Sequence, residues 1–263
     1  KTNRGHTIVD SKKSMQILKD LGFKINAHIM VGLPEQDNKE IEEFFSNDEY
    51  RPDMIKIYPC LIMPGTQLEK EFKEGKFQPL ETKEAIKIIA QFKTTLPQYV
   101  RIMRVQRDIP TKQTTAGVDK TNLRQMIFAY MKENNLHCTC IRCNEIKEEI
   151  TNPKLQVLEY TASGGKEFFI SFQQDKQIIG FCRLRFPKEC LREEITKDSA
   201  IIRELHVYGE AIDREKVGTV QHKGFGKMLM QKAEEICKEN QKNKLLVISG
   251  VGVREYYKKK LGY

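Results

Sequence analysis

The sequence lacks any long apolar run, and no signal-peptide pattern opens it. A membrane-spanning helix needs about 20 consecutive apolar residues, and a secretory leader needs a basic, an apolar and a small-residue region in succession. These absences exclude a membrane span within this sequence, and we expect a soluble, cytoplasmic protein. The 263 residues, 39% of them hydrophobic and 31% charged, suffice for two domains with substantial cores.

The sequence also lacks an even number of cysteines, and its 7 cysteines argue against the disulfide framework of a secreted domain. In a chain without secretory features, such cysteines are more typical of free thiols or metal ligands. The formal net charge of +9 favours a polyanionic partner such as nucleic acid or CoA, although an ordinary lysine-rich surface gives the same balance. The chain begins with Lys rather than Met and stops at Leu-Gly-Tyr, so we expect a fragment of a longer protein.

Two glycines, Gly224 and Gly226, open a segment whose apolar residues recur at helical spacing. A glycine-bearing loop that leads into a helix presents unpaired backbone N–H groups and the positive end of the helix dipole, which together suit a pyrophosphate. Such glycine pairs also occur in plain turns. The context favours the phosphate site, because one strand signal at 201–208 precedes the loop and another at 245–250 follows the helix.

Together with the tyrosine pair at 256–257, this order of strand, Gln-x-x-Gly-x-Gly, helix and strand resembles the acetyl-CoA site of the GNAT acetyltransferases. The resemblance implies that the end of the first strand receives the thioester and the pantetheine arm, and that the loop and the helix start contact the pyrophosphate. The residues that it implies for acetyl-CoA binding are Glu204, Leu205, His206, Val207, Gln221, His222, Lys223, Gly224, Phe225, Gly226, Lys227 and Tyr257.

The catalytic candidates are Tyr257, Tyr256 and Glu204. Tyr257 is the candidate proton donor to the departing CoA thiolate, for which a phenol with a pKa of about 10 is a suitable acid. Either tyrosine of the pair can face the site, and two adjacent aromatics that simply pack are the alternative. Glu204 is either a general base or a solvent-facing residue at the strand edge. We expect His206 to lie on the opposite face of that strand and to be a packed residue rather than a catalyst.

Helix and strand signals alternate in the first part of the chain. Amphipathic patterns at 12–21, 38–45 and 81–92 predict helices, and apolar runs at 23–31, 54–60 and 99–104 predict strands. Repeated units of this kind indicate parallel strands joined by crossover helices. The pattern resembles the C-terminal half of a radical-SAM barrel, a partial TIM-like α/β fold in which chemistry is placed where the strands end.

Three stretches carry a sharper resemblance, and they lie at 28–34 (His-Ile-Met-Val-Gly-Leu-Pro), at 107–110 (Arg-Asp-Ile-Pro) and at 203–209 (Arg-Glu-Leu-His-Val-Tyr-Gly). They resemble the Elongator catalytic-subunit family of tRNA wobble-uridine modifying enzymes, in which a radical-SAM domain precedes a GNAT domain. The resemblance implies acetyl-CoA as cosubstrate, tRNA as partner, and other Elongator subunits or a second copy as further partners. It also implies SAM and a [4Fe–4S] cluster in the intact protein. That cluster is held by three cysteines early in the barrel, and no such loop precedes Cys60, so we expect neither a cluster nor the radical step from this fragment alone.

Three cysteines, Cys138, Cys140 and Cys143, lie close enough in the sequence for their thiolates to reach one ion. Zn²⁺ takes four such ligands in a tetrahedron, so we expect a structural zinc in the linker. Three reduced thiols in a turn and an iron–sulfur cluster are the alternatives. The fourth ligand is not evident, because His137 is adjacent to Cys138 and would strain a shared tetrahedron, and a residue of the barrel is an equal candidate.

Basic residues gather between the two predicted domains, where they suit the phosphate backbone of tRNA. The candidates are Arg104, Arg107, Lys112, Lys120 and Arg124. A solvated helix face is the alternative. The sequence thus predicts the C-terminal part of a radical-SAM barrel at 1–110, a basic linker with a Cys-rich zinc-type site at 111–153, and a mixed α+β GNAT domain at 154–263.

The leading functional hypothesis is acetyl-CoA-dependent modification of the tRNA wobble uridine, with a carboxymethyl-type group installed at C5 by SAM radical chemistry in the intact protein. A lysine acetyltransferase acting on proteins is the reading that the GNAT motif alone would give, although the positive charge opposes a basic peptide substrate. A non-enzymatic, acetyl-CoA-gated tRNA-binding module is the third hypothesis.

Overall fold

The computed structural model describes residues 5–106, 109–208 and 224–263. The chain divides into two units. The first unit comprises Lys1–Gly5, Asn26–Asn47 and Arg51–Cys143, and the second comprises His6–Ile25, Asp48–Tyr50 and Asn144–Tyr263. Two short segments from the first part of the sequence therefore belong to the unit that contains the C-terminal half. None of the described helices is long and apolar enough to cross a membrane.

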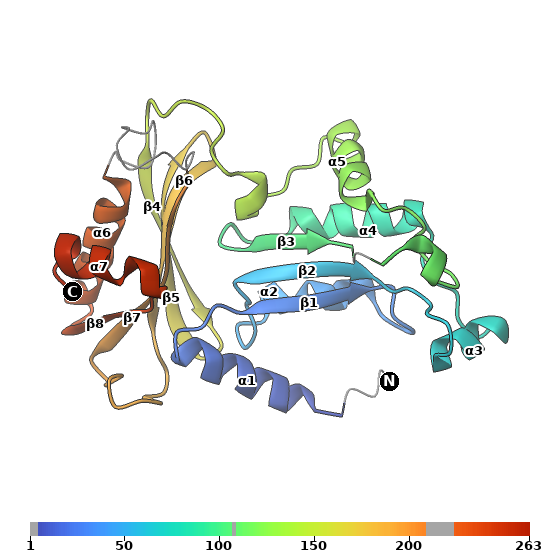
Figure 1. Ribbon diagram of the computed structural model, residues 1–263, viewed down its shortest axis with the longest axis horizontal. Coiled ribbons are helices and arrows are strands. Elements are labelled where there is room, and N and C mark those ends of the chain that lie inside the picture. The colour runs from blue at the N-terminus through green and yellow to red at the C-terminus, as the bar shows by residue number, and fades with distance from the viewer. Residues whose placement is uncertain (1–4, 107–108, 209–223) are drawn as a thin grey trace. The chain divides into compact units, whose positions relative to one another are not determined.

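The first unit contains a parallel sheet with the strand order β1 (Asn26–Val31), β2 (Met54–Pro59) and β3 (Arg101–Val105) (Figure 1). Isoleucines at the centre of each strand are buried, and in β1 and β3 the buried residues alternate with half-buried or exposed ones. The helices are α2 (Glu43–Ser46), α3 (Gln67–Lys73), α4 (Thr82–Thr94) and α5 (Leu123–Glu133), with 3₁₀ turns η1 (Asn38–Ile41), η2 (Thr111–Gln113) and η3 (Ile141–Cys143). Helix α4 runs along the sheet and packs against α5.

The second unit contains a five-stranded sheet with the order β4 (Lys154–Ala162), β5 (Gly165–Gln174), β6 (Gln177–Phe186), β7 (Ser199–Val207) and β8 (Lys244–Val247). Neighbours are antiparallel up to β7, and β7 and β8 are parallel. Two-residue turns close the first two hairpins, and their central residues have the positive φ angles that match the twist of the strands. The helices of this unit are α1 (Ile8–Asp20), α6 (Phe225–Glu239) and α7 (Arg254–Tyr256), with a 3₁₀ turn η4 (Val251–Val253) and a π-helical turn η5 (Tyr257–Leu261).

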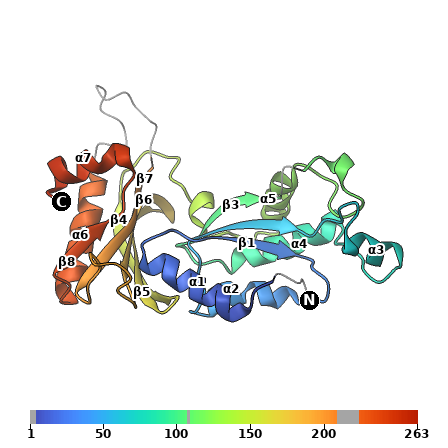
Figure 2. The same ribbon diagram turned by 60° about the horizontal axis from the view of Figure 1, so that its bottom comes forward.

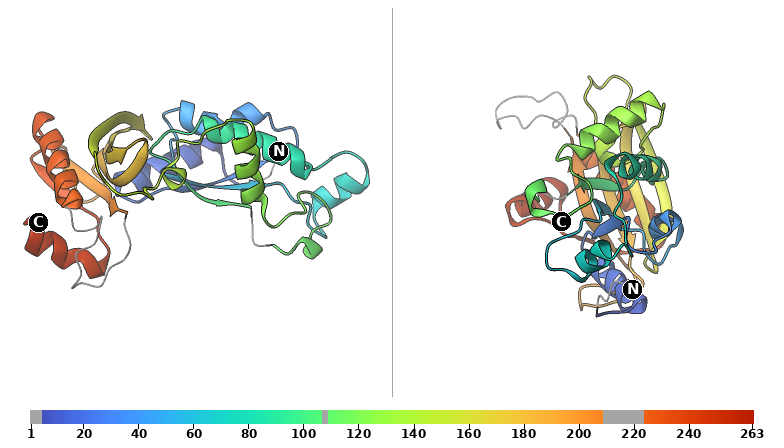
Figure 3. Two further views of the ribbon diagram at one scale, coloured as in Figure 1. Left: turned by 90° about the horizontal axis from the view of Figure 1, so that it is seen from above. Right: turned by 90° about the vertical axis from the view of Figure 1, so that its right-hand side faces the viewer.

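Helix α6 covers one face of this sheet (Figure 2). Its buried residues Phe225, Leu229 and Ala233 join the inward-facing residues of β5, β6 and β7 in one apolar core. The C-terminal end of the chain lies beside α6 (Figure 3). Its residues pack against the same core, and the Tyr263 hydroxyl donates a hydrogen bond of 2.8 Å to Glu234 of α6. The core therefore fixes the start of α6, the end of β7 and the C-terminal turn relative to one another.

Candidate functional site

Strands β7 and β8 separate at the end of β7. They pair from Ser199 opposite Lys244 to Ile202 opposite Val247, whereas β7 continues to Val207. Beyond Ile202, the backbone of β7 therefore presents an edge that β8 does not cover. Such an edge can donate hydrogen bonds to an extended ligand.

A β-bulge lies at the point where the two strands separate. On β6, Leu184 pairs with Ile202, but the adjacent Arg183 pairs with Glu204, so Arg203 is an extra residue in β7. The extra residue reverses the alternation of side chains that follows it. As a result, Leu205 and Val207 pack against the core on the α6 side.

The N-terminus of α6 lies beside these two residues. Gly224 precedes the helix with φ of 80°, a conformation that favours glycine, and no side chain caps the first turn. A Cβ atom built on Gly226 would lie 3.3 Å from Tyr256 Oη, 3.8 Å from Val207 and 4.0 Å from Leu205. The structure thus brings the helix start, the end of β7 and a tyrosine hydroxyl together. Phe225 is buried against Phe172, with ring centroids 5.0 Å apart, and Lys227 is exposed.

The two candidate tyrosines have different surroundings. Tyr257 packs against the core, and burial, followed by the neighbouring Cys182, raises its pKa to about 12. Tyr256 is 38% exposed, and burial of the rest of its side chain raises its pKa. Both phenols therefore hold their protons at neutral pH, as a proton donor requires. Tyr256 has the hydroxyl that lies beside Gly226, so it is the nearer of the two to the helix start.

Glu204 is held in ion pairs. One carboxylate oxygen accepts a hydrogen bond from Arg183 Nε at 2.9 Å, and the other accepts one from Lys24 Nζ at 3.1 Å. Burial alone would raise the pKa of Glu204, but the charges of Arg183 and Lys24 outweigh it and leave the pKa below its usual value. A carboxylate that is paired through both oxygens is a poor proton acceptor, so this geometry favours a structural role over general-base catalysis.

His206 lies on the same face of the strand as Glu204. The two residues are opposite Phe181 and Arg183 of β6, which are two residues apart. The expectation of opposite faces was wrong, since residues two apart on a strand share a face. His206 is also exposed rather than packed in the core, and its ring stacks on Phe181 with centroids 5.8 Å apart.

Four predicted site residues lie outside the part of the chain that the structure describes, namely Gln221, His222, Lys223 and Arg107. The other basic candidates lie in the first unit. Arg104, Lys112 and Lys120 are exposed, and Lys120 pairs with Asp119 at 3.2 Å. Arg124 differs from them, because it is half-buried and its guanidinium faces the Phe128 ring at 6.0 Å.

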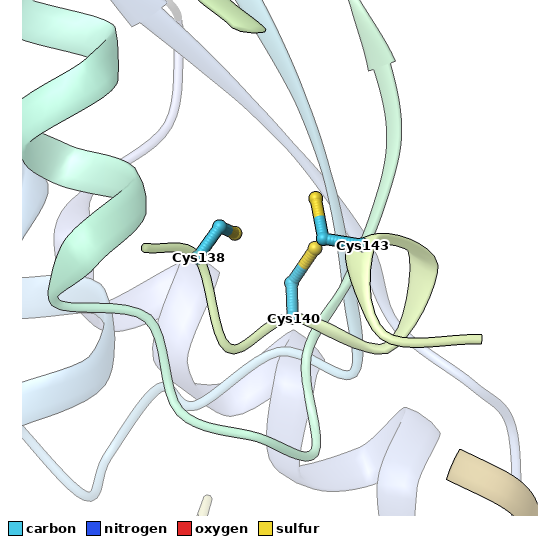
Figure 4. A group of neighbouring side chains, drawn as sticks. All are labelled: Cys138, Cys140 and Cys143. Carbon is cyan, nitrogen blue, oxygen red and sulfur yellow. The ribbon is translucent and has the colours of Figure 1, made fainter. Parts of the chain in front are cut away.

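The three cysteines of the linker form one cluster (Figure 4). Cys138 precedes η3, Cys140 is fully buried, and Cys143 ends η3. Their sulfur atoms all lie within 4.8 Å of one another. Thiolates about 2.3 Å from a tetrahedral zinc ion lie about 3.8 Å apart, so the three residues fit such an ion after a small adjustment. Within the described residues, no further histidine, cysteine or carboxylate joins this group, and His137 is exposed.

A buried lysine accompanies the cluster, and sequence analysis did not identify it. Lys93 of α4 is 1% exposed, and its ammonium lies 3.8 Å from Cys143 Sγ and 4.4 Å from the centre of the Phe128 ring. Hydrogen bonds from the Cys138 and Cys140 thiols hold the pKa of Cys143 well below its usual value, and the charge of Lys93 adds to this effect. A thiolate is thereby favoured, and it is the form that binds metals. Lys93 is 50 residues from Cys143 in the sequence, so no local pattern could have indicated this contact.

Comparison with known proteins gives two family matches and close relatives along the whole chain. Residues 52–133 match the radical-SAM C-terminal domain, and residues 136–263 match the acetyltransferase (GNAT) family. The tRNA uridine(34) acetyltransferase of Methanocaldococcus infernus is 44% identical over 99% of this chain and 52% of its own length. Elongator complex protein 3 of Homo sapiens is 38% identical over 100% of this chain and 51% of its own length.

A solved structure has the same fold. The archaeal Methanocaldococcus infernus Elp3 with an N-terminal deletion superposes with a TM-score of 0.91 at 43% identity, over 99% of this chain and 66% of that one. The match confirms the predicted fold class, a radical-SAM C-terminal domain followed by a GNAT domain. The chain spans about half the length of the curated relatives it matches. It is a homologue of the tRNA uridine(34) acetyltransferases and of Elongator complex protein 3, and it belongs to their family.

Proposed function

We propose that this chain is the acetyl-CoA-binding part, together with some of the tRNA-binding surface, of an enzyme that modifies the wobble uridine of tRNA. One observation carries the proposal. The uncovered end of β7, the uncapped start of α6 and the hydroxyl of Tyr256 converge around Gly226. The end of β7 suits the thioester and the pantetheine arm, and the start of α6 suits the pyrophosphate. The tyrosine hydroxyl suits the departing sulfur. The relatives' names supply the substrate class.

The site suits cleavage of the acetyl thioester. The backbone N–H groups of Leu205 and Val207, which point away from β6, can stabilise the negative charge that develops on the thioester oxygen. The first-turn N–H groups of α6 and the exposed Lys227 can hold the pyrophosphate. When the C–S bond breaks, a tyrosine hydroxyl can deliver a proton to the departing sulfur, and Tyr256 and Tyr257 are the candidates.

The rest of the reaction belongs to the whole protein. There, SAM and a [4Fe–4S] cluster supply the radical chemistry by which a carboxymethyl-type group is joined to C5 of the uracil. The exposed Arg104, Lys112 and Lys120 are proposed contacts for the tRNA phosphates, and Arg107 is retained as a sequence prediction. Arg124 is a weaker candidate, because it packs beside the cysteine cluster. We place the enzyme in the cytoplasm, and further subunits or a second copy are proposed partners.

For the cysteine cluster we propose a structural Zn²⁺ held by Cys138, Cys140 and Cys143. Three convergent thiols with a buried ammonium beside one of them fit a metal held by thiolates. When bound, the ion would connect the loop that follows α5 to the turn η3 through its cysteine ligands. The fourth ligand comes from outside this group of residues.

The release of free CoA from acetyl-CoA tests the proposed function. We expect unmodified tRNA to stimulate release by this chain, and we expect one of the variants Tyr256→Phe and Tyr257→Phe, the one that removes the proton donor, to lower the stimulated rate by about 10-fold or more. A Tyr130→Phe variant, which changes a tyrosine of α5 in the first unit, is the matched control.

Three outcomes would count against this function. Acetylation of a lysine peptide without any effect of tRNA would favour a protein acetyltransferase. Binding of both ligands without CoA release would favour an acetyl-CoA-gated tRNA-binding module. Full activity in both tyrosine variants would remove the tyrosines from the mechanism.

A further inference from the structure

The segment Lys19–Lys24 consists of the last two residues of α1 and the four residues that follow. It packs against the five-stranded sheet on the face opposite α6. Glu167, Arg185 and Arg203 alternate along their strands with core residues that face α6, so they point away from that helix. All three side chains are at most 2% exposed, as are Lys19 and Asp20 of α1. The segment lies outside residues 136–263, which match the GNAT family.

A chain of charged contacts joins this segment to the sheet. Asp20 accepts hydrogen bonds from Arg185 Nε at 2.9 Å and from its terminal nitrogen at 2.5 Å. Arg185 also donates to Glu167 at 2.8 Å, and Arg203 donates to the other oxygen of Glu167 at 2.8 Å. Lys19 lies 3.5 Å from Glu167. Asp20 thus links α1 to β6, and Glu167 links β5 to α1, β6 and β7.

The cluster also contacts the β4–β5 turn. The Arg185 guanidinium donates to the carbonyl oxygens of Ala162 and Ser163 at 2.9 and 3.2 Å. A Cβ atom on Gly165 would lie 2.5 Å from the centre of that guanidinium. The side chain of Ser163 in turn donates to the backbone of Tyr50 at 2.7 Å, within the second short segment that this unit takes from the first part of the sequence.

The segment holds Arg203, the extra residue of the β7 bulge, and also Glu204, which follows it. Arg203 donates to the carbonyl oxygen of Phe23 at 2.8 Å, and Lys24 donates to Glu204 at 3.1 Å. The bulge is what turns Leu205 and Val207 toward the start of α6. Without it these two side chains would face the opposite side of the sheet. The contacts of Phe23 and Lys24 therefore act directly on the feature that shapes the proposed site.

We propose that Lys19–Lys24 is the positioning element of the acetyl-CoA-binding strand, acting through the Asp20–Arg185–Glu167–Arg203 cluster and the Lys24–Glu204 ion pair. Arg203 and Glu204 are positioning residues, because their side chains bind Glu167, Phe23, Arg183 and Lys24 on the face of the sheet opposite α6. Removing one partner from a buried ion cluster leaves the others without compensation, and we expect the bulge that they hold to shift. The proposal rests on the proposed function for the identity of the ligand.

The test compares Asp20→Asn, Lys24→Met and the conservative Lys24→Arg in the same chain. Hydrogen–deuterium exchange in the ligand-free protein should quicken at 202–207 in the first two variants, and acetyl-CoA should bind about 10-fold more weakly. Lys24→Arg keeps the ion pair and should restore both values. Lys24 is partly exposed, with 41% of its side chain accessible, so Lys24→Met should fold even if Asp20→Asn does not. Lys13 of α1 forms an exposed ion pair with Glu189. Lys13→Met removes that pair and is the control that should change neither value.

The two ways of failing are distinguishable. If the unsubstituted chain does not bind acetyl-CoA, the proposed function fails, and the exchange rates at 202–207 still decide the positioning claim. If the chain binds acetyl-CoA and Lys24→Met leaves both exchange and affinity unchanged, the positioning claim is overturned. Equal losses in Lys24→Met and Lys24→Arg would also overturn it, because the ion pair would then not be the cause.

Discussion

Replacing Gly226 by valine is expected to abolish acetyl-CoA binding while both units stay folded. A Cβ atom at this position already meets Tyr256 Oη at 3.3 Å and lies 3.8 Å from Val207 and 4.0 Å from Leu205, and valine adds two methyl groups to that atom. They would fill the space where we place the pantetheine arm and push the ligand away from the first-turn N–H groups of α6. We expect the dissociation constant to rise by at least about 100-fold, or about 2.7 kcal/mol, in isothermal titration calorimetry.

Gly252→Val is the matched control for this substitution. Gly252 lies in the turn η4, and no atom lies within 4 Å of a Cβ built there. Its substitution should leave the affinity for acetyl-CoA near that of the unsubstituted chain. If Gly226→Val binds acetyl-CoA as tightly as the control, the ligand does not pass between α6 and the end of β7.

Replacing Cys140 by alanine is expected to remove the bound metal and to destabilise the loop that carries the cluster. Cys140 is fully buried and is the middle cysteine of the three. Structural zinc binding contributes roughly 10 kcal/mol or more to folding in small zinc domains, far more than one buried thiol can contribute by packing. Metal analysis should find about one zinc per chain before the substitution and close to none after it, and thermal unfolding should begin at a lower temperature.

Cys190→Ala is the control for the metal site, because Cys190 is exposed and lies outside the cluster. It should leave both metal content and unfolding unchanged. A chain that holds no metal before any substitution would favour the alternative of three reduced thiols in a turn. Metal that is retained in Cys140→Ala would place the site elsewhere.

Helices and strands could be predicted from the sequence where the pattern of apolar residues lies within one element. The strands at 54–60 and 99–104 and the helix at 81–92 were found within a few residues of their observed bounds, because apolar periodicity reports burial directly. Helix α1 begins at Ile8, earlier than predicted, because Thr7 and Asp10 form a capping box that the apolar pattern did not include. Helix α3 was not predicted, since none of its residues is buried.

The candidate site was predictable as a motif, but its internal contacts were not. The sequence indicated that the strand at 201–208 precedes the loop and the helix, which is a matter of order along the chain. It gave no sign of the bulge at Arg203, because a bulge is a property of the pairing between two strands. For the same reason Glu204 resembled a general base, since its partners Lys24 and Arg183 are 180 and 21 residues away.

The domain boundaries remain a prediction from the sequence, and the two units of the structure are not continuous along the chain. Residues 6–25 and 48–50 are part of the second unit, although sequence order places them in the predicted barrel. The charged contacts of Asp20 and Lys24 are a physical reason that residues 6–25 group with the second unit, and a boundary drawn along the sequence cannot represent such a grouping.

Hydrogen–deuterium exchange with and without a non-hydrolysable acetyl-CoA analogue is the most direct test of the acetyl-CoA site. The analogue should protect the backbone amides of Leu205 and Val207 at the end of β7 and those of the first turn of α6, and the two sets should be protected together as the analogue saturates. Protection confined to other parts of the chain, with these two segments exchanging as before, would contradict the site described above.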